Sequence, residues 1–472
     1  MKLQKITNFV IVVLVITAIF QTQKLWLEGT SGHNFFYTVF GDIPSKNSQA
    51  DGNVLLATRY AVGEGEGIFS VYYPDDTGSS SMLETANGVL REILAQNSGG
   101  SEKKTADWRE ILEDRCIVMQ YDFMIASEEY LERFKNAKSS ERLKQFDYIT
   151  VIPAKRAGEM SHAYFVNSET NECVEFSASE VNSAPSLYRI LVTEPDDTPY
   201  ISTGQRTGSS VLWRNLFLPQ WADLPHTYGA LEQEHAFEKD GEPSRTLLEN
   251  TVENFFRNFS VDWSTRDENG VFTFSDSETV VKYFPRERVL AYYSYENYGD
   301  DRESISLTEG YQICCNFLKN DNSLETDIYL ADVERTINNE LIYYFDYAVD
   351  DLPVYLSQNV QDKTGSAHAI EMTVRNRAVK EYRRYAVNYT VSPAQDERVE
   401  VQFIDALDEA NRMYQSAVEE KVISDVKNIS LGYQVEPQGP IRLKWFVNLY
   451  DYIFVVDTDR TETETRVTSP EE

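Results

Sequence analysis

The sequence predicts an α+β protein in which one N-terminal transmembrane helix is followed by three extracytoplasmic domains of antiparallel sheet and helices. Three observations lead to this prediction. The chain opens with a long uncharged apolar segment, period-2 strand patterns then alternate with amphipathic helix patterns, and the second half contains an internal repeat. The roughly 445 residues beyond the apolar segment are enough for about three domains of typical size.

The transmembrane helix is predicted over residues 6–27. No charged side chain occurs between Lys5 and Lys24, and a single charge at the centre of a spanning helix would cost roughly 2.5–3.5 kcal/mol. At a rise of about 1.5 Å per residue, the segment forms a helix of about 33 Å, enough to span a hydrocarbon core of about 30 Å.

Flanking residues set the direction in which this helix crosses the membrane. Lys2 and Lys5 precede it, and Trp26 falls where an indole ring is favoured at the far headgroup layer. Because basic residues stay on the cytoplasmic side, residues 1–5 are predicted in the cytoplasm and the body outside. The chain is thus predicted to be a single-pass protein of the cell membrane.

A cleaved signal peptide is the competing interpretation of the same segment, because it shares a basic start and an apolar core. Such peptides end in small residues at the spacing A-x-A. Here Ile16 stands two positions before Ala18, and no cysteine follows the apolar run as it would in a lipoprotein signal. The sequence therefore favours an uncleaved anchor.

The composition excludes some classes of partner. The net charge is −32 and the isoelectric point is near 4.6, so phosphate groups are repelled rather than neutralised. No nucleic acid is expected as a partner, and flat adhesion to an anionic membrane face is disfavoured for the same reason. The 29 tyrosines and 24 phenylalanines indicate well-filled globular domains.

The first extracytoplasmic domain is predicted over residues 28–205, because residues 194–210 have the composition of a linker. A capping box at Ser81 and Glu84 predicts a helix over residues 81–95. Further helices are expected at 108–112 and 128–134, and strands at 54–60, 68–73, 116–125, 148–153, 163–167 and 172–176. The glycine-rich residues between the first two strands are predicted to be a turn, because their glutamates would repel phosphate.

A repeat of about 100 residues lies in the second half. Residues 280–295 match residues 378–390, and each match is followed by an amphipathic helix, a polar strand start and an aromatic strand. These features lie at 306–318, 327–330 and 342–347 in the first copy and at 403–414, 428–431 and 443–448 in the second. The sequence therefore predicts two tandem β-β-α-β-β units.

The repeat sets the remaining domain boundaries. A middle domain is predicted over residues 206–360, with a lead-in helix after the N-cap Ser244 and the first copy of the repeat. The second copy forms a C-terminal domain over residues 361–458. The charged, apolar-poor tail, residues 459–472, is expected to be disordered.

Four cysteines occur, at Cys116, Cys173, Cys314 and Cys315. Outside the cell they permit disulfides in three connectivities. A chain of this length does not need such crosslinks, so buried free thiols are favoured, and the disulfide state is left open.

No catalytic constellation appears in the sequence. There is no HExxH and no GxSxG pattern. The only carboxylate–histidine cluster, His226, Glu232, Glu234 and His235, lies in a stretch expected to be a solvated loop rather than a metal site. We therefore predict no catalytic, metal-binding or cofactor-binding residue and no small-molecule substrate, so the chain is expected to act by contact and not as an enzyme.

Three segments of the chain resemble the YycH/YycI group of Gram-positive bacteria. They are the opening segment 5–28, the strand pair 54–73 with its helix 81–95, and the closing segment 423–457. Within the closing segment, Leu431-Gly432-Tyr433 and the stretch from Pro440 to Trp445 match a pattern that recurs near the C-terminus of that family. The chain length and the three external domains resemble the YycH branch.

The resemblance implies a function and partners. Members of the group are single-pass proteins that regulate the sensor kinase of the WalK/WalR (YycG/YycF) cell-wall two-component system, partly through contacts between transmembrane helices. The implied partners are a sensor histidine kinase of WalK type and a YycI-like protein. Small and polar side chains mediate helix contacts in lipid, so Thr7, Asn8, Thr17 and Ala18 form the candidate contact face, with mere tolerance of lipid as the alternative.

Two other functions stay open. An anchored extracytoplasmic binding module for cell-wall polymer or peptide would use an aromatic groove containing Tyr343, Tyr344 and Trp445, although such residues are more often core. A wall hydrolase without a recognised motif is the third.

We predict that the anchor stays uncleaved. A reporter fused after Glu28 is expected to be active only outside the cell, and the mass of the mature protein is expected to include Met1. Release of a soluble form that begins near Thr22 would contradict this prediction.

Overall fold

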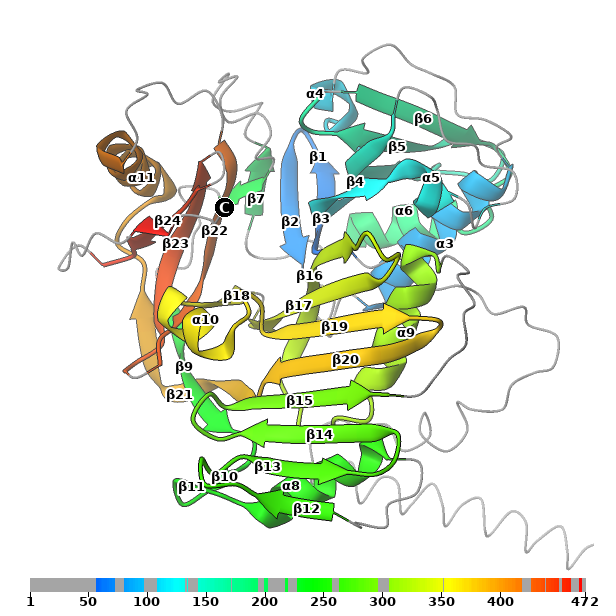
Figure 1. Ribbon diagram of the computed structural model, residues 1–472. Helices are drawn as coiled ribbons and strands as arrows, with labels where there is room; N and C mark the ends of the chain where they lie inside the picture. Colours follow the sequence, from blue (N-terminus) through cyan, green and yellow to red (C-terminus); the bar gives the residue numbers. More distant parts are fainter. Residues whose placement is uncertain are drawn as a thin grey trace, which may run out of the picture. The chain divides into compact units, whose positions relative to one another are not determined.

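The computed structural model describes residues 57–72, 80–96, 108–131, 134, 143–170, 172–193, 199–202, 217–219, 227–256, 263–295, 305–350, 352–417, 426–437, 439–449, 452–459 and 467–468. The chain divides into two units, Met1–Gly52 and Asn53–Glu472. All described residues belong to the second unit, which is an α+β fold of strands and helices (Figure 1).

The predicted transmembrane helix lies outside the described residues. The same holds for its candidate contact face and for the interface tryptophan, that is, Thr7, Asn8, Thr17, Ala18 and Trp26. Within the described part, no helix is both long enough and apolar enough to cross a membrane. The anchor therefore stays a prediction from the sequence.

The first sheet has eight strands. They are β1 (Arg59–Gly65), β2 (Ile68–Tyr72), β3 (Cys116–Ala126), β4 (Gln145–Ile152), β5 (Ser161–Asn167), β6 (Glu172–Ala178), β7 (Pro199–Ser202) and β8 (Phe217–Pro219). Their order is β6-β5-β4-β3-β1-β2-β7-β8, and every neighbouring pair is antiparallel.

Four helices accompany this sheet: α3 (Ser80–Gln96), α4 (Trp108–Ile111), α5 (Ser127–Leu131) and α6 (Ala184–Thr193). Helix α3 packs on β4, β5 and β6, and α6 contacts both α3 and β1. The apolar stripe that predicts α3 is buried, with Ala86, Val89, Leu90 and Ile93 inaccessible to solvent. Because this stripe recurs every three to four residues, a single helix face covers the sheet.

Strands β1 and β2 form a hairpin whose two-residue turn is Glu66-Gly67. Both residues have positive φ, +58° and +73°, which is the geometry of a type I′ turn and favours glycine. The prediction of a turn in the glycine-rich segment is therefore confirmed.

The predicted end of the first domain at residue 205 falls inside the first sheet. Strand β7 lies before this position and β8 after it, and the two strands pair with each other. The segment with linker composition therefore contains the start of a strand pair that closes the sheet edge, and the sheet ends at Pro219.

The second sheet has thirteen strands. They are β12 (Trp263–Arg266), β13 (Phe272–Ser275), β14 (Thr279–Phe284), β15 (Val289–Ser294), β16 (Asp327–Arg335), β17 (Leu341–Val349), β18 (Leu352–Leu356), β19 (Ile370–Arg375), β20 (Ala378–Tyr385), β22 (Val426–Val435), β23 (Arg442–Leu449), β24 (Tyr452–Asp457) and β25 (Val467–Thr468). The order is β12-β13-β14-β15-β20-β19-β17-β18-β22-β23-β24-β25, and β16 pairs with β17 at the side.

The strands of the two predicted repeat copies share this one sheet. Strand β20 pairs with β15, and β19 pairs with β17, so strands beyond residue 361 insert between strands that precede residue 360. The predicted boundary between the middle and C-terminal domains is therefore not a boundary between sheets. Both segments do contain a strand pair, a helix and a second strand pair, and the superposition of the two copies stays a prediction.

Two helices cover different parts of the second sheet. Helix α9 (Leu307–Leu318) packs on β17, β19 and β20, and Figure 1 shows it behind these strands. Helix α11 (Phe403–Ala417) packs on β23 and β24. The predicted N-cap of α9 is confirmed, because Ser306 Oγ accepts a hydrogen bond from Glu309 N at 3.2 Å.

Smaller elements complete the fold. Helix α8 (Arg245–Val252) has the predicted N-cap Ser244, α10 (Gln358–Thr364) follows β18, and a short 3₁₀ helix spans Glu253–Phe255. Two further strand pairs are β10 (Glu238–Lys239) with β11 (Glu242–Pro243), and β9 (Thr227–His235) with β21 (Val387–Arg398).

The acidic tail is not wholly without structure. Val467 and Thr468 form β25, which pairs with Phe454 and Ile453 of β24. The expectation of a fully disordered tail after residue 459 is therefore wrong at these two residues.

The four cysteines are free thiols. Cys116, Cys173 and Cys314 are buried, and Cys315 is half-buried. This agrees with the expectation of buried free thiols, except that Cys315 is only partly covered.

A charged pair lies in the core of the second sheet. Arg384 and Asp321 are both almost inaccessible to solvent, and Arg384 Nη1 donates to Asp321 Oδ2 at 2.7 Å. Burial by itself would raise the pKa of Asp321, but the guanidinium and three hydrogen bonds hold it below its usual value. The carboxylate is therefore ionised in the folded protein.

Replacement of Asp321 tests this pair. Asp321→Asn leaves the guanidinium of Arg384 buried without its counter-charge, so we expect the free energy of unfolding to fall by about 3–5 kcal/mol. Glu249→Gln is the matched control, since it removes an exposed pair with Arg245 worth at most about 0.5 kcal/mol. Urea unfolding followed by circular dichroism measures both, and equal midpoints for the two variants would contradict the prediction.

Candidate functional site

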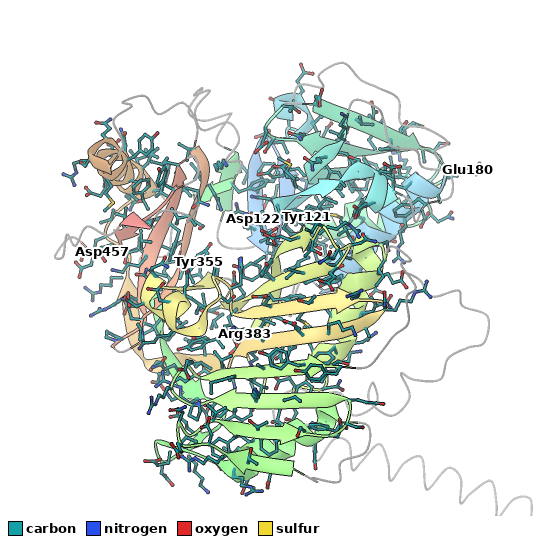
Figure 2. All side chains as sticks on the ribbon, viewed as in Figure 1. Tyr121, Asp122, Glu180, Tyr355, Arg383 and Asp457 are labelled. Carbon is teal, nitrogen blue, oxygen red and sulfur yellow. The ribbon has the colours of Figure 1, made fainter. Side chains whose placement is uncertain are left out.

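A cavity of about 370 Å³ lies between the two large sheets. Strands β3 and β4 line it from the first sheet, and strands of the second sheet from β16 to β24 line it from the other side. Figure 2 labels Asp122 on β3 and Tyr355 on β18, one lining residue from each side. The cavity is therefore formed by segments that are far apart in the sequence.

Strand alternation explains which side chains face the cavity. On β23, Trp445 and Val447 are fully buried, and Val447 pairs with Phe454 on the face covered by α11. The intervening residues Phe446 and Asn448 point to the opposite face and line the cavity. One face of the sheet is thus closed by helices, and the other carries the cavity.

Carboxylates from both sheets line the cavity. Asp122 and Asp147 come from β3 and β4, whereas Asp332 and Asp346 come from β16 and β17. Glu169, in the turn after β5, is the fifth lining carboxylate. The lining side chains of opposite charge are Lys427 and, when protonated, His368. The cavity therefore carries an excess of negative charge.

Burial raises the pKa values of several of these carboxylates. It raises the pKa of Asp147 to about 6, although hydrogen bonds from the backbone N–H and hydroxyl of Ser168 act in the opposite direction. It also raises the pKa of Asp122, against the attraction of Arg59, and that of Asp332. The ionised forms of these groups are therefore less stable here than in water.

His368 is held by a carboxylate at the edge of the cavity. Its Nδ1 lies 2.9 Å from Asp346 Oδ2, and Asp346 Oδ1 accepts from Ala369 N at 2.9 Å. Burial would lower the pKa of His368, but Asp346, Asp332 and Glu371 outweigh it and the pKa is raised. The imidazolium form is therefore favoured beside these carboxylates.

Aromatic rings form another part of the wall. Tyr355 of β18 and Phe446 of β23 pack with ring centroids 4.0 Å apart. The hydroxyl of Tyr355 lies 3.2 Å from Ser430 Oγ of β22, the strand between them. Tyr148 and Tyr329 line the cavity as well. The site therefore combines carboxylates with aromatic faces.

Side-chain contacts join the two sheets beside the cavity. Arg59 of β1 donates to Gln120 Oε1 at 2.7 Å within its own sheet and to Asn428 Oδ1 of β22 at 2.9 Å. At another place, Arg335 of β16 donates to both carboxylate oxygens of Glu129, at 3.2 and 2.6 Å. Bidentate arginine pairs fix orientation as well as distance, so these contacts hold the cavity walls in register.

The cavity brings together carboxylates and aromatic faces, which are groups that can recognise a ligand. Ser168 is the only serine among the described lining residues. Its hydroxyl donates a hydrogen bond to Asp147 and does not contact His368. A nucleophile needs an adjacent base to be activated. Ser168 is therefore not paired with the histidine of this cavity.

The sequence-predicted cluster of carboxylates and histidines is not a loop. Glu232, Glu234 and His235 lie on strand β9, and His226 lies outside the described residues. Glu232 accepts a hydrogen bond from Ser392 of β21 at 2.6 Å. In the part of the chain that the structure describes, no group of three His, Cys, Asp or Glu residues is placed to hold a metal ion.

The prediction of an aromatic groove formed by Tyr343, Tyr344 and Trp445 is wrong. Tyr343 and Trp445 are fully buried, and their polar atoms donate to backbone carbonyls, Tyr343 Oη to Leu307 at 2.5 Å and Trp445 Nε1 to Val401 at 2.8 Å. Only Tyr344 is partly exposed, and its hydroxyl lies 3.3 Å from Glu334. The first two residues are core residues.

The residues that carry the family resemblance near the C-terminus are architectural. A Cβ atom at Gly432 would lie 2.8 Å from Pro353 O and from the ring of Tyr355, because β22 runs beside β18 there. Tyr433 is buried and donates to Gly229 O at 2.6 Å. The Leu431-Gly432-Tyr433 pattern therefore serves the joint between strands rather than a reactive site.

Sequence reasoning missed the cavity. The sequence feature that could have indicated the cavity is an aspartate between two aromatic residues of a strand. It occurs twice, in Tyr121-Asp122-Phe123 and in Phe345-Asp346-Tyr347. A charged residue at such a position must face water, a partner or a cavity. The sequence did not show that these two positions meet.

The comparisons with known proteins add the following. No protein-family model and no curated protein matches the chain. The solved structure of YycH from Bacillus subtilis is similar, with 14% sequence identity, a TM-score of 0.46, and coverage of 87% of this chain and 97% of that one. An uncharacterized protein from Eubacterium rectale shows 10% identity, a TM-score of 0.34, and coverage of 58% and 89%. The first bears the name of the family that the sequence resembles.

The raised pKa of Asp147 predicts a dependence of stability on pH. Since the folded carboxyl titrates near pH 6 and an unfolded one near 3.8, its favourable contribution is present below about pH 4 and is lost as pH rises through 6. Raising the pH from 4 to 7.5 is therefore expected to increase the free energy of unfolding of Asp147→Asn, relative to that of wild type, by up to about 3 kcal/mol.

Urea unfolding at the two pH values measures this difference. Ser168→Ala serves as the comparison, because it removes the hydroxyl hydrogen bond to the carboxylate and keeps the backbone one. The pKa of Asp147 is then expected to rise further, and the loss of stability with rising pH is expected to be larger. If the difference in free energy of unfolding between Asp147→Asn and wild type were the same at both pH values, this would contradict the raised pKa of Asp147.

Proposed function

We propose that the chain is a non-enzymatic, membrane-anchored regulator of a sensor histidine kinase of WalK type, acting through transmembrane and extracytoplasmic contacts. The observation that carries the proposal is the resemblance of the segments 5–28, 54–95 and 423–457 to the YycH/YycI group. A YycI-like protein is proposed as the second partner.

The described part of the chain is compatible with this role. The second segment folds as the β1–β2 hairpin followed by α3, and the third as the strands β22, β23 and β24. A regulator that acts by contact depends on its scaffold, and the matching residues Gly432 and Tyr433 serve the scaffold here.

The anchor is proposed to contact the transmembrane helices of the kinase. Each polar pair between helices in lipid contributes about 0.6–2 kcal/mol, and each 1.4 kcal/mol of differential binding shifts a two-state equilibrium tenfold. Thr7, Asn8, Thr17 and Ala18 are therefore enough to change kinase activity if they bind one kinase state better than the other. No catalytic group is required.

A second candidate function is an anchored binding module in the extracytoplasmic space. The cavity between the two sheets favours it, since rings and carboxylates from separate strands converge there. This function and kinase regulation are compatible within one chain.

Replacement of the anchor tests the proposed mechanism. With residues 6–22 exchanged for an unrelated apolar span, we expect kinase control to be lost while the external body still folds and reaches the membrane. A wall-stress reporter and a pull-down of the kinase measure the effect, with the double variant Thr7→Leu and Asn8→Leu as a finer probe. Full regulation by the variant with the exchanged anchor would move the contact to the external domains.

A further inference from the structure

We infer that the cavity between the two sheets binds a small organic cation, a molecule that carries a primary amine or a guanidinium group. The inference goes beyond kinase regulation and does not depend on it. It rests on the charge of the cavity, on its aromatic wall and on its size.

The charge of the lining points to a cation. Asp122, Asp147, Asp332, Asp346 and Glu169 face the cavity, against Lys427 and His368, and Arg59 lies behind the wall with its guanidinium bound to Gln120 and Asn428. Anionic ligands are repelled by this excess. A cation, in contrast, is attracted by a lining in which carboxylates outnumber basic side chains.

Burial of the carboxylates favours the binding of a cation beside them. It raises the pKa of Asp122, Asp147 and Asp332, so their ionised forms are destabilised by burial. An ammonium or guanidinium group between them would lower these pKa values again. By linkage, a cation that lowers these pKa values binds more tightly to the ionised carboxylates than to the protonated ones.

The aromatic wall favours an organic cation over a bare ion. The paired rings of Tyr355 and Phe446 lie on the same cavity as the carboxylates. Aromatic faces attract ammonium and guanidinium groups through their quadrupole and pack against the alkyl stem. The described residues also contain no three-ligand group placed for a metal ion, which is a further reason to expect an organic cation.

The size of the cavity suits a ligand of this kind. Its volume of about 370 Å³ lies within the range of roughly 300–1,000 Å³ that small-molecule sites occupy. An extended five-carbon amine fits this space, with its charged end among the aspartates and its alkyl part against the rings.

A titration of the full-length chain in detergent micelles tests the inference. The probe is Nα-acetyl-lysine amide, and the control ligand is Nα-acetyl-norleucine amide, which has the same backbone and an alkyl side chain without the charge. We expect calorimetry or ligand-observed NMR to detect binding of the lysine derivative and at least about tenfold weaker binding of the norleucine derivative. Binding is also expected to weaken between pH 7.5 and 5, as the carboxylates are protonated.

Variants locate the binding. Asp122→Asn and Asp332→Asn, one from each sheet, are each expected to weaken binding of the lysine derivative at least about tenfold, since hydrogen bonds to charged groups are the strong ones. Tyr355→Leu is expected to weaken it about threefold or more. Glu268→Gln, an exposed acidic residue on the turn before β13, is the matched control and is expected to leave it unchanged.

Three results would overturn the inference. They are equal binding of the lysine and norleucine derivatives, tighter binding of calcium ions or of N-acetylglucosamine than of the amine at the same sites, and amine binding that is the same in both aspartate variants as in wild type. Thermal unfolding of each variant shows whether it is folded, and a variant that does not fold is replaced by its partner from the other sheet. Since no kinase is present, a failure here leaves the proposed regulation untouched.

Discussion

The buried pair of Arg384 and Asp321 is the constraint on which the second sheet depends. Arg384 stands on β20, in the middle of the thirteen strands, and its guanidinium also donates to Ser323, to the hydroxyl of Tyr347 on β17 and to Asn388 on β21. It therefore ties the turn after α9 to three strands at once. Isolated buried charges are costly, and the strand order that brings these partners together avoids this cost.

This requirement explains why strands of the two predicted repeat copies share one sheet. Arg384 belongs to the second copy, and Asp321 and Tyr347 belong to the first. If each copy formed its own sheet, the guanidinium would lose its carboxylate. The insertion of β19 and β20 beside β15 and β17 is therefore what joins the charges, and it connects β12–β15 with β17, β18 and β22–β25 in one sheet.

Local features were predictable from the sequence, and long-range ones were not. The helix caps at Ser244 and Ser306, the turn at Glu66-Gly67 and the apolar stripes of α3 and α11 depend on residues a few positions apart. The sheet order depends on contacts such as Arg384 with Asp321, 63 residues apart. The cavity depends on contacts that are longer still, since Arg59 and Asn428 are 369 residues apart. Hydrophobic periodicity shows that Asp122 and Asp346 interrupt aromatic strands, but it carries no information on which strands will face each other.

The position of the cavity gives its ligand a mechanical consequence. Its carboxylates come from two sheets, and polar contacts beside the cavity help to join them, such as the hydrogen bonds of Arg59 with Asn428 and of Arg335 with Glu129. Burial and, less strongly, the charge of Asp122 raise the pKa of Asp332 across the cavity, so repulsion between these two carboxylates opposes the contacts. A bound cation attracts both sides and stabilises their approach, and linkage fixes the size of this effect as RT ln(1 + [L]/Kd). At a hundredfold excess over Kd this is about 2.7 kcal/mol, comparable to several of the polar contacts between the sheets. A ligand in the cavity would therefore act directly on the joint between the two sheets.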